Sequence, residues 1–181
     1  MQLKEVIHSR TTHRKFTPYK PISREIDQIL EAAKLAPSWA NTQVWRFVIV
    51  QNQETIRKIA KLIPLANPAR KCTQDSNLVI VCCFEKNKSG RILGIKSTNI
   101  QGWGMFDLAL AVENMSLQVH DMGLGSVIIG IFDRSKIRKI LNIPEHFEVA
   151  VLLTVGKPEK PNKKPTKKLP IDKIAYWEKY K

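Results

Sequence analysis

Two segments in the first third of the chain carry apolar residues at helical spacing. The first predicts a helix from Ser23, as its N-cap, to Ala36, and the second predicts a helix over residues 56–63. A proline follows each segment, Pro37 and Pro64, and disfavours helical geometry in the residue before it. One apolar stripe per helix is typical of helices that cover a larger layer.

Four short apolar runs predict strands, over residues 46–50, 78–84, 126–132 and 147–155. The run over residues 78–84 is apolar throughout, which is typical of a strand covered on both faces. Residues 103–122 predict a helix that is apolar on more than one face, so it should be central or lie at a subunit interface. Asp133 is expected to cap a short helix that ends at Leu141, whereas residues 85–102 predict a loop.

This alternation predicts a single layered domain of α/β or α+β class over residues 1–181. Its last part, residues 157–181, is rich in Lys and Pro and predicts a basic C-terminal arm, with a candidate helix over residues 171–180. No apolar run reaches the roughly 18 residues that a membrane span needs, and no secretory signal begins the chain. Three cysteines are too few for a disulfide framework, so we expect the protein to be located in the reducing cytoplasm.

Charge changes the picture, because the 181 residues hold 30 Lys and Arg against 16 Asp and Glu, a net charge of +14. The first twenty residues contribute +4 and residues 157–181 contribute +6. Such clusters fit either non-specific nucleic-acid binding or one anion site where the two ends meet. The Lys-rich arm has few interleaved aromatic residues and the chain has no known nucleic-acid module, which disfavours nucleic acid as a partner.

Common catalytic and binding motifs are absent from the sequence. It has no Gly-x-Gly-x-x-Gly or Walker loop, no metal-ligand spacing among its His and Cys residues, and no Gly-x-Ser-x-Gly elbow. Adjacent Cys82 and Cys83 sit in an apolar run, where packing is the expected role. If the protein is an enzyme, a bound cofactor must therefore supply the chemistry, and no catalytic side chain or metal is predicted.

Residues 9–16 carry a different signal, since Arg10, Thr12 and Arg14 occupy alternate positions. An Arg with a hydroxyl two residues further on can grip a phosphate group. This segment resembles the Arg-x-Ser/Thr-x-Arg/Lys-x-Phe opening of the nitroreductase family of FMN-dependent oxidoreductases. Three further blocks resemble that family in the same order, namely residues 32–47, 106–126 and 155–170.

The resemblance implies the nitroreductase-like three-layer α+β fold, in which helices flank a central mixed, mostly antiparallel sheet. It also implies an intertwined homodimer with a C-terminal arm. Site residues are implied in four groups. The FMN phosphate would be contacted by Arg10, Thr11, Thr12, Lys167 and Lys168, and the pyrimidine edge of the flavin by Arg14 and Lys71. The partner subunit would contribute Pro37, Ser38, Trp39 and Asn41, and the flavin ring would be passed by Ile128, Ile129 and Gly130.

The Gly130 N–H is expected near flavin N5. Trp39 is bulkier than the residue usual at its position in the family, so it should narrow the space for substrate beside the flavin. The function implied is hydride transfer from NADH or NADPH through FMN to a small acceptor such as a nitroaromatic or a quinone. Two alternatives stay open at this point. One is a basic anion-binding or nucleic-acid-binding protein without catalysis, and the other is a flavin-binding or flavin-modifying specialist on the same fold.

Overall fold

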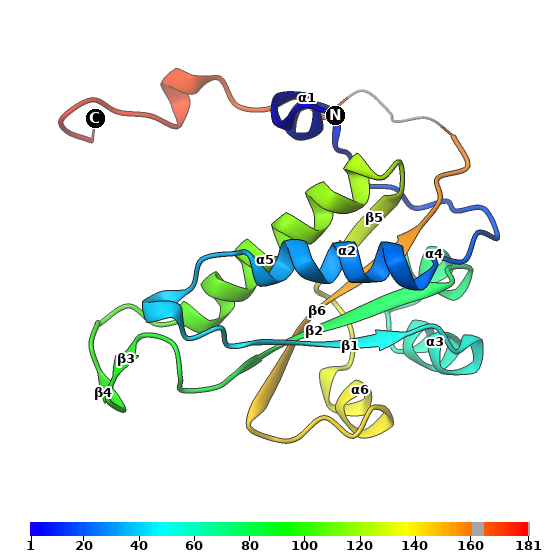
Figure 1. Cartoon of the computed structure of the whole chain (residues 1–181), viewed down its shortest axis with the longest axis horizontal. Coiled ribbons are helices and arrows are strands. Elements are labelled where there is room, and N and C mark those ends of the chain that lie inside the picture. The colour runs from blue at the N-terminus through cyan, green and yellow to red at the C-terminus, as the bar shows by residue number, and fades with distance from the viewer. Residues whose placement is uncertain (161–164, 181) are drawn as a thin grey trace.

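The computed structural model describes residues 1–160 and 165–180. Four strands form one sheet in the order β1-β2-β6-β5, and each neighbouring pair is antiparallel (Figure 1). The strands are β1 (Trp45–Val50), β2 (Leu78–Glu85), β5 (Gly125–Ile129) and β6 (Phe147–Gly156). The first six residues of β2 are all buried, which confirms the prediction of a strand covered on both faces.

Helices cover both faces of this sheet. One face carries α2 (Ser23–Lys34) and α5 (Trp103–Asp121), and the other carries α3 (Gln53–Lys61), α4 (Ala69–Gln74) and α6 (Arg134–Ile140). Alternate residues of β2 divide between two apolar clusters: Ile80 and Cys82 pack with α2 and α5, whereas Val81 and Cys83 pack with the other three helices. The predicted three-layer α+β arrangement is confirmed.

Several predicted boundaries move because local hydrogen bonds decide them. Helix α2 ends at Lys34 rather than at Ala36, and its N-cap is Ile22, whose N–H donates to the Glu25 carboxylate at 2.8 Å. Helix α3 begins earlier than predicted, since the Asn52 side chain accepts the N–H of Thr55 at 2.9 Å. The predicted cap Asp133 is confirmed: its carboxylate accepts the N–H of Lys136 at 3.1 Å.

Four small elements do not follow the predictions. Helix α1 (Leu3–Ser9) buries only Val6, and α4 has six residues, so neither leaves a periodic apolar signal. A hairpin of β3 (Arg91–Ile92) and β4 (Ile95–Lys96) occupies part of the predicted loop, with positive φ at both turn residues, Leu93 and Gly94. The candidate helix over residues 171–180 is wrong, because only the short 3-10 turn η2 (Ile171–Lys173) forms there.

The N-terminal segment after α1 runs along the end of the sheet. Thr12 forms a parallel bridge with Ser126, whose carbonyl accepts the N–H of His13 at 3.0 Å, and the Thr17 N–H donates to the Lys157 carbonyl at 2.8 Å. Within the described residues the sheet is antiparallel rather than mixed, and this bridge supplies a parallel contact at its edge. The segment therefore holds the start of the chain beside the end of β6.

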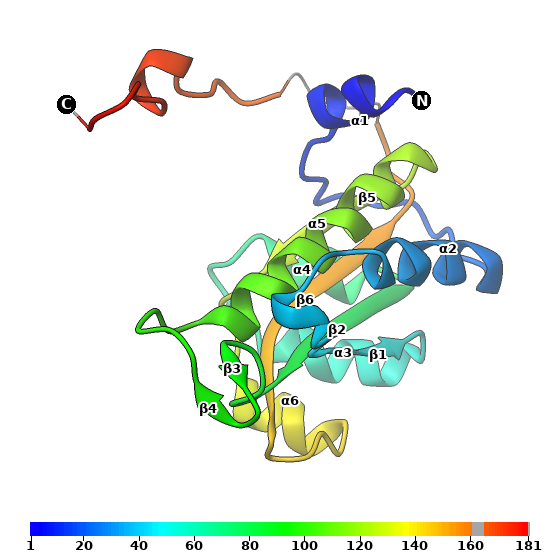
Figure 2. The same ribbon diagram turned by 60° about the vertical axis from the view of Figure 1, so that its left-hand side comes forward.

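Residues 165–180 extend away from the sheet, beyond α1 (Figures 1 and 2). Every one of these residues is exposed, including apolar side chains such as Leu169, Ile171 and Trp177. No helix in the described part of the chain has the length and apolar content to cross a membrane.

Close packing of the N-terminal segment on the sheet can be tested at Gly156. A Cβ at Gly156 would lie 2.6 Å from the Phe16 ring, whereas a Cβ at Gly130 would meet no atom within 4 Å. We expect Gly156→Ala to lower the free energy of unfolding by about 1–3 kcal/mol, because the Phe16 ring has to move. Urea denaturation measures this loss, with Gly130→Ala as the matched control. Equal unfolding free energies for the two variants would contradict the packing described here.

Candidate functional site

A group of cationic and hydroxyl side chains lies where the N-terminal segment meets β5. The bridge between Thr12 and Ser126 places Arg10, Thr12 and Arg14 along the first residues of that strand. Thr12 and Arg14 are exposed and Arg10 is half-buried. Across residues 1–160 and 165–180, the side chains of these three residues have neither a hydrogen bond nor an ion pair. Unpaired donors gathered at one place fit an anion such as a phosphate group.

Two buried histidines lie beneath this group. The Ser9 hydroxyl is 2.7 Å from His120 Nε2, and the Thr11 hydroxyl is 3.4 Å from His13 Nε2. Burial first, and then the charges of His13 and Arg10, lower the pKa of His120, although Asp121 opposes the shift. A lowered pKa favours the neutral form of the His120 ring. The sequence gives no sign of this pairing, because Ser9 and His120 are 111 positions apart.

Helix α4 borders the same region. Burial raises the pKa of the Cys72 thiol to about 11, and the charge of Arg14 partly opposes this shift, so Arg14 lies near the helix that carries Lys71. Lys71 itself is exposed and forms an ion pair with Asp75 at 3.2 Å. At neutral pH the Cys72 thiol stays protonated and is a poor nucleophile. Among the described residues, no three His, Cys, Asp or Glu side chains are placed to hold a metal ion.

The end of β5 is open on one side. Ile129 is buried in the cluster beneath α3, α4 and α6, whereas Ile128 is 45% exposed and belongs to neither apolar cluster. The backbone of Gly130 faces empty space, since an added Cβ would meet nothing within 4 Å. Ile128 and Gly130 thus offer an apolar side chain and an accessible backbone at the end of β5 away from the Thr12 bridge, while Ile129 can contribute only its backbone.

The segment that contains Pro37, Ser38, Trp39 and Asn41 lies elsewhere. Its 3-10 turn η1 (Trp39–Asn41) has positive φ at Ala40 and Asn41, and Gln43 shares this geometry. Non-glycine residues rarely adopt it, so the surrounding contacts must hold the turn. The Ser38 hydroxyl accepts the N–H of Gln43 at 3.0 Å, and the Trp39 ring lies 4.5 Å from the Trp103 ring.

Asp107 of α5 holds this turn. Its side chain is buried, with the residue 1% exposed, and it accepts hydrogen bonds from the Trp39 N–H at 3.0 Å and the Ser89 hydroxyl at 2.6 Å. The Thr42 hydroxyl lies 3.5 Å from the same carboxylate. No Lys, Arg or His in the described part of the chain forms an ion pair with it. Sequence reasoning missed this residue, whose signal is a single acidic side chain on an apolar face of a long helix.

The predicted site residues therefore form two separate groups. Asp107 contacts one group and His120 contacts the other, and these residues are about 20 Å apart along the axis of α5. Figure 1 shows η1 (cyan) near the first turn of α5, whereas β5 begins beside the last turn of that helix and runs back along it. Lys167 and Lys168 are exposed in the arm, and no hydrogen bond or ion pair joins them to Arg10 or Thr12. One small ligand cannot touch both groups within one chain.

The importance of Asp107 can be tested by removing its carboxylate. Asp107→Ala leaves the buried Trp39 N–H and Ser89 hydroxyl without their acceptor, so we expect a loss of about 2–4 kcal/mol in unfolding free energy. The control is Asp27→Ala, because Asp27 is exposed on α2, and it should change stability by less than about 0.5 kcal/mol. Urea denaturation compares the two variants. A similar stability for both would show that Asp107 does not hold the turn.

Comparison with known proteins identifies the family of the chain. The model of the nitroreductase family matches residues 7–157. A candidate NADH dehydrogenase/NAD(P)H nitroreductase of Methanothermobacter thermautotrophicus is 30% identical over an alignment of 162 residues, which covers 87% of this chain and 78% of that protein.

Solved structures share the fold. A nitroreductase family protein of Clostridium novyi NT is 28% identical with a TM-score of 0.78, over 88% of this chain and 86% of its own. An FMN-dependent nitroreductase of Clostridium difficile R20291 is 21% identical with a TM-score of 0.83, over 98% of this chain and 100% of its own. Because the family model covers most of its length, the chain belongs to the nitroreductase family and is an oxidoreductase of that family.

Proposed function

We propose that the protein is an FMN-dependent oxidoreductase that takes hydride from NADH or NADPH and passes electrons to a small acceptor such as a nitroaromatic or a quinone. The observation that carries this proposal is the set of unpaired donors of Arg10, Thr12 and Arg14 at the start of β5, with the open backbone of Gly130 directly after the end of that strand. A dianionic phosphate at one end and a flat ring at the other match this arrangement. The name of the related FMN-dependent nitroreductase supports the same cofactor.

Each residue in this group has a proposed role. Arg10, with Thr11 and Thr12, binds the phosphate, and Lys167 and Lys168 of an arm add positive charge to it. Arg14 and Lys71 lie beside the pyrimidine edge, where a cation favours the reduced, more negative form of the ring. Bound FMN would supply the hydride chemistry. The chain's own task is to position the ring and to exclude water, and no side chain has to act as nucleophile or base.

A homodimer completes the proposed site. The two groups of site residues lie at opposite ends of α5, so the Ser38 to Asn41 turn has to come from a partner subunit to meet the cofactor held by Arg10. The arm supports this view, because an apolar side chain such as Trp177, which is 86% exposed here, is stable when it is covered. We propose that residues 1–181 form one domain whose arm packs on the second copy.

We place this dimer in the cytoplasm. Cys72, Cys82 and Cys83 are all buried free thiols, which suits a reducing compartment. In this proposal the two basic ends of the chain contact the cofactor and the second subunit. Their positive charge is therefore explained without nucleic-acid binding.

The phosphate role of Arg10 predicts a selective loss of cofactor. We expect purified protein to be yellow and Arg10→Ala to weaken FMN affinity by about tenfold or more, as for the loss of charge-assisted hydrogen bonds. The control Lys61→Ala removes an exposed cation of α3 and should leave FMN content unchanged. Absorbance after denaturation measures the flavin released per chain. Equal losses in both variants would point to a general charge effect, and colourless protein that takes up no FMN would refute the proposal.

Subunit mixing tests whether the site is shared. Asn41→Asp keeps a residue that tolerates the positive φ of this position, +55°, but places a negative charge in the turn. We expect Arg10→Ala and Asn41→Asp homodimers each to bind FMN poorly. In a heterodimer of the two, one site combines the intact Arg10 of one subunit with the intact Asn41 of the other.

Co-expression with two affinity tags isolates this heterodimer. One FMN bound per heterodimer at near wild-type affinity is the expected result. If both residues served a cofactor in the same chain, no intact site would exist and the heterodimer would bind as poorly as its parents.

A further inference from the structure

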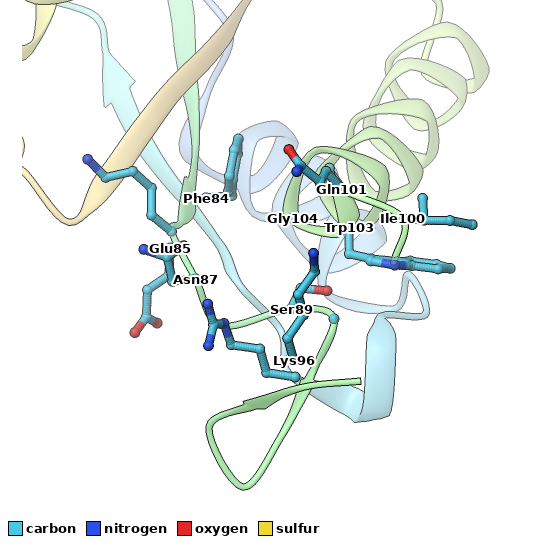
Figure 3. A pocket seen from close by; sticks show the side chains of 13 residues that line it. Phe84, Glu85, Asn87, Ser89, Lys96, Ile100, Gln101, Trp103 and Gly104 are labelled. Carbon is cyan, nitrogen blue, oxygen red and sulfur yellow. The ribbon is translucent and has the colours of Figure 1, made fainter. Parts of the chain in front are cut away.

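A cavity of about 480 Å³ lies between the end of β2, the β3–β4 hairpin and the first turn of α5 (Figure 3). It has the size of a small-molecule pocket. In Figure 3, Lys96 lies on the hairpin side, and Gln101 and Trp103 lie on the helix side. The cavity belongs to neither of the two groups of site residues described above.

The charge of this cavity is positive. Lys86, Arg91 and Lys96 line it, and its single lining carboxylate, Glu85, is already paired with Lys88 at 2.9 Å. Arg91 donates one N–H to the Gly94 carbonyl at 2.9 Å, which holds the guanidinium on the hairpin and leaves further donors free. Within residues 1–160 and 165–180, Lys86 and Lys96 have no hydrogen-bond or ion-pair partner through their side chains. Such a donor-rich lining suits an organic anion.

The walls of the cavity are fixed by close contacts rather than by flexible side chains. A Cβ at Gly90 would lie 2.7 Å from the Trp103 ring, and a Cβ at Gly104 would lie 2.5 Å from the Phe84 ring. The neighbouring Ser89 hydroxyl donates to Asp107 at 2.6 Å. Two aromatic rings therefore form a preformed apolar wall beside the cations.

The same wall continues toward the proposed cofactor site. The Trp103 ring is 4.5 Å from the Trp39 ring, with the planes tilted by 55°. Trp39 belongs to the turn that we propose faces the cofactor of the partner subunit. A molecule whose charged group lies among Arg91 and Lys96 can therefore direct its ring along these aromatic side chains toward that cofactor.

We propose that this cavity binds the electron acceptor, and that the acceptor is a nitroaromatic or quinone that also carries a carboxylate group. NADH or NADPH is oxidised, the nitro or quinone group is reduced, and the carboxylate serves only for binding. Arg91 and Lys96 bind the carboxylate, and Phe84 and Trp103 contact the ring. This inference rests on the proposed function for the identity of the ligand as an acceptor, but the binding of the anion depends only on the cavity. The two statements can therefore fail separately.

The test compares 4-nitrobenzoate with 4-nitrobenzamide, which has the same shape without the charge. We expect the wild-type holoprotein to bind the acid about tenfold more tightly by calorimetry, and to show a similar ratio of kcat/KM in NADPH oxidation. In the double variant Arg91→Gln and Lys96→Gln the preference should fall to near unity, with FMN content and amide binding unchanged. The control double variant Lys61→Gln and Lys139→Gln removes equal charge at exposed sites and should keep the preference.

Three results would overturn this inference. The first is equal wild-type affinity for the acid and the amide, and the second is a preference that survives in the Arg91 and Lys96 variant. The third is a variant that keeps the acid preference but loses discrimination between NADPH and NADH, which would assign the cavity to the donor's phosphate. Protein that takes up no added FMN but still binds the acid through Arg91 and Lys96 would refute the proposed function and leave the anion site standing.

Discussion

A buried carboxylate without a cation determines how one end of this molecule is built. Asp107 accepts hydrogen bonds from Trp39 and Ser89, and these donors come from segments that precede it by 68 and 18 positions. A buried charge is costly unless such donors surround it, so both segments have to stay in place together. The left-handed turn at Ala40 and Asn41, the tilted contact of Trp39 with Trp103 and the wall of the cationic cavity all depend on this one side chain.

At the other end of α5, backbone hydrogen bonds rather than a buried side chain hold the structure together. Here the N-terminal segment is held by backbone hydrogen bonds to Ser126 and Lys157, and by close packing over Gly125 and Gly156. The backbone is thus fixed without using the side chains of Arg10, Thr12 and Arg14, which remain available to an anion. At the Asp107 end, polar side chains form hydrogen bonds within the chain. At the other end, the side chains of Arg10, Thr12 and Arg14 remain available to a ligand.

The sequence predicts the layers well because burial leaves a clear pattern. The run over residues 78–84 is apolar since both faces of β2 are covered. Helix α5 buries one stripe and leaves apolar side chains such as Phe106 exposed, 54% in that case, so its second apolar face has no cover within the described residues. The hairpin of β3 and β4 leaves no such pattern, because its residues from Ile92 to Lys96 are exposed. Residues 130–132 look like a strand but leave the sheet, where Arg134 donates to the Gly130 carbonyl at 2.8 Å.

The site residues also differ in how far the sequence could predict them. Arg10, Thr12 and Arg14 could be singled out because they are neighbours in sequence, and the fold keeps them together. Asp107 and His120 could not, because their roles come from donors and neighbours far away along the chain. The cationic cavity was hidden for a related reason: its lysines and its aromatic wall meet only after β2 and α5 pack.

The length of helix α5 has a further consequence for the proposed dimer. In a two-fold dimer that shares its cofactors as proposed, each copy of the helix spans from one binding site to the other, and the length of the helix sets the spacing of both. Inserting one residue between Asp107 and His120 would turn one end relative to the other by about 100° and would disturb two sites at once. Side chains along α5 can therefore vary as packing allows, whereas the number of residues between its two ends is fixed by the distance between cofactors.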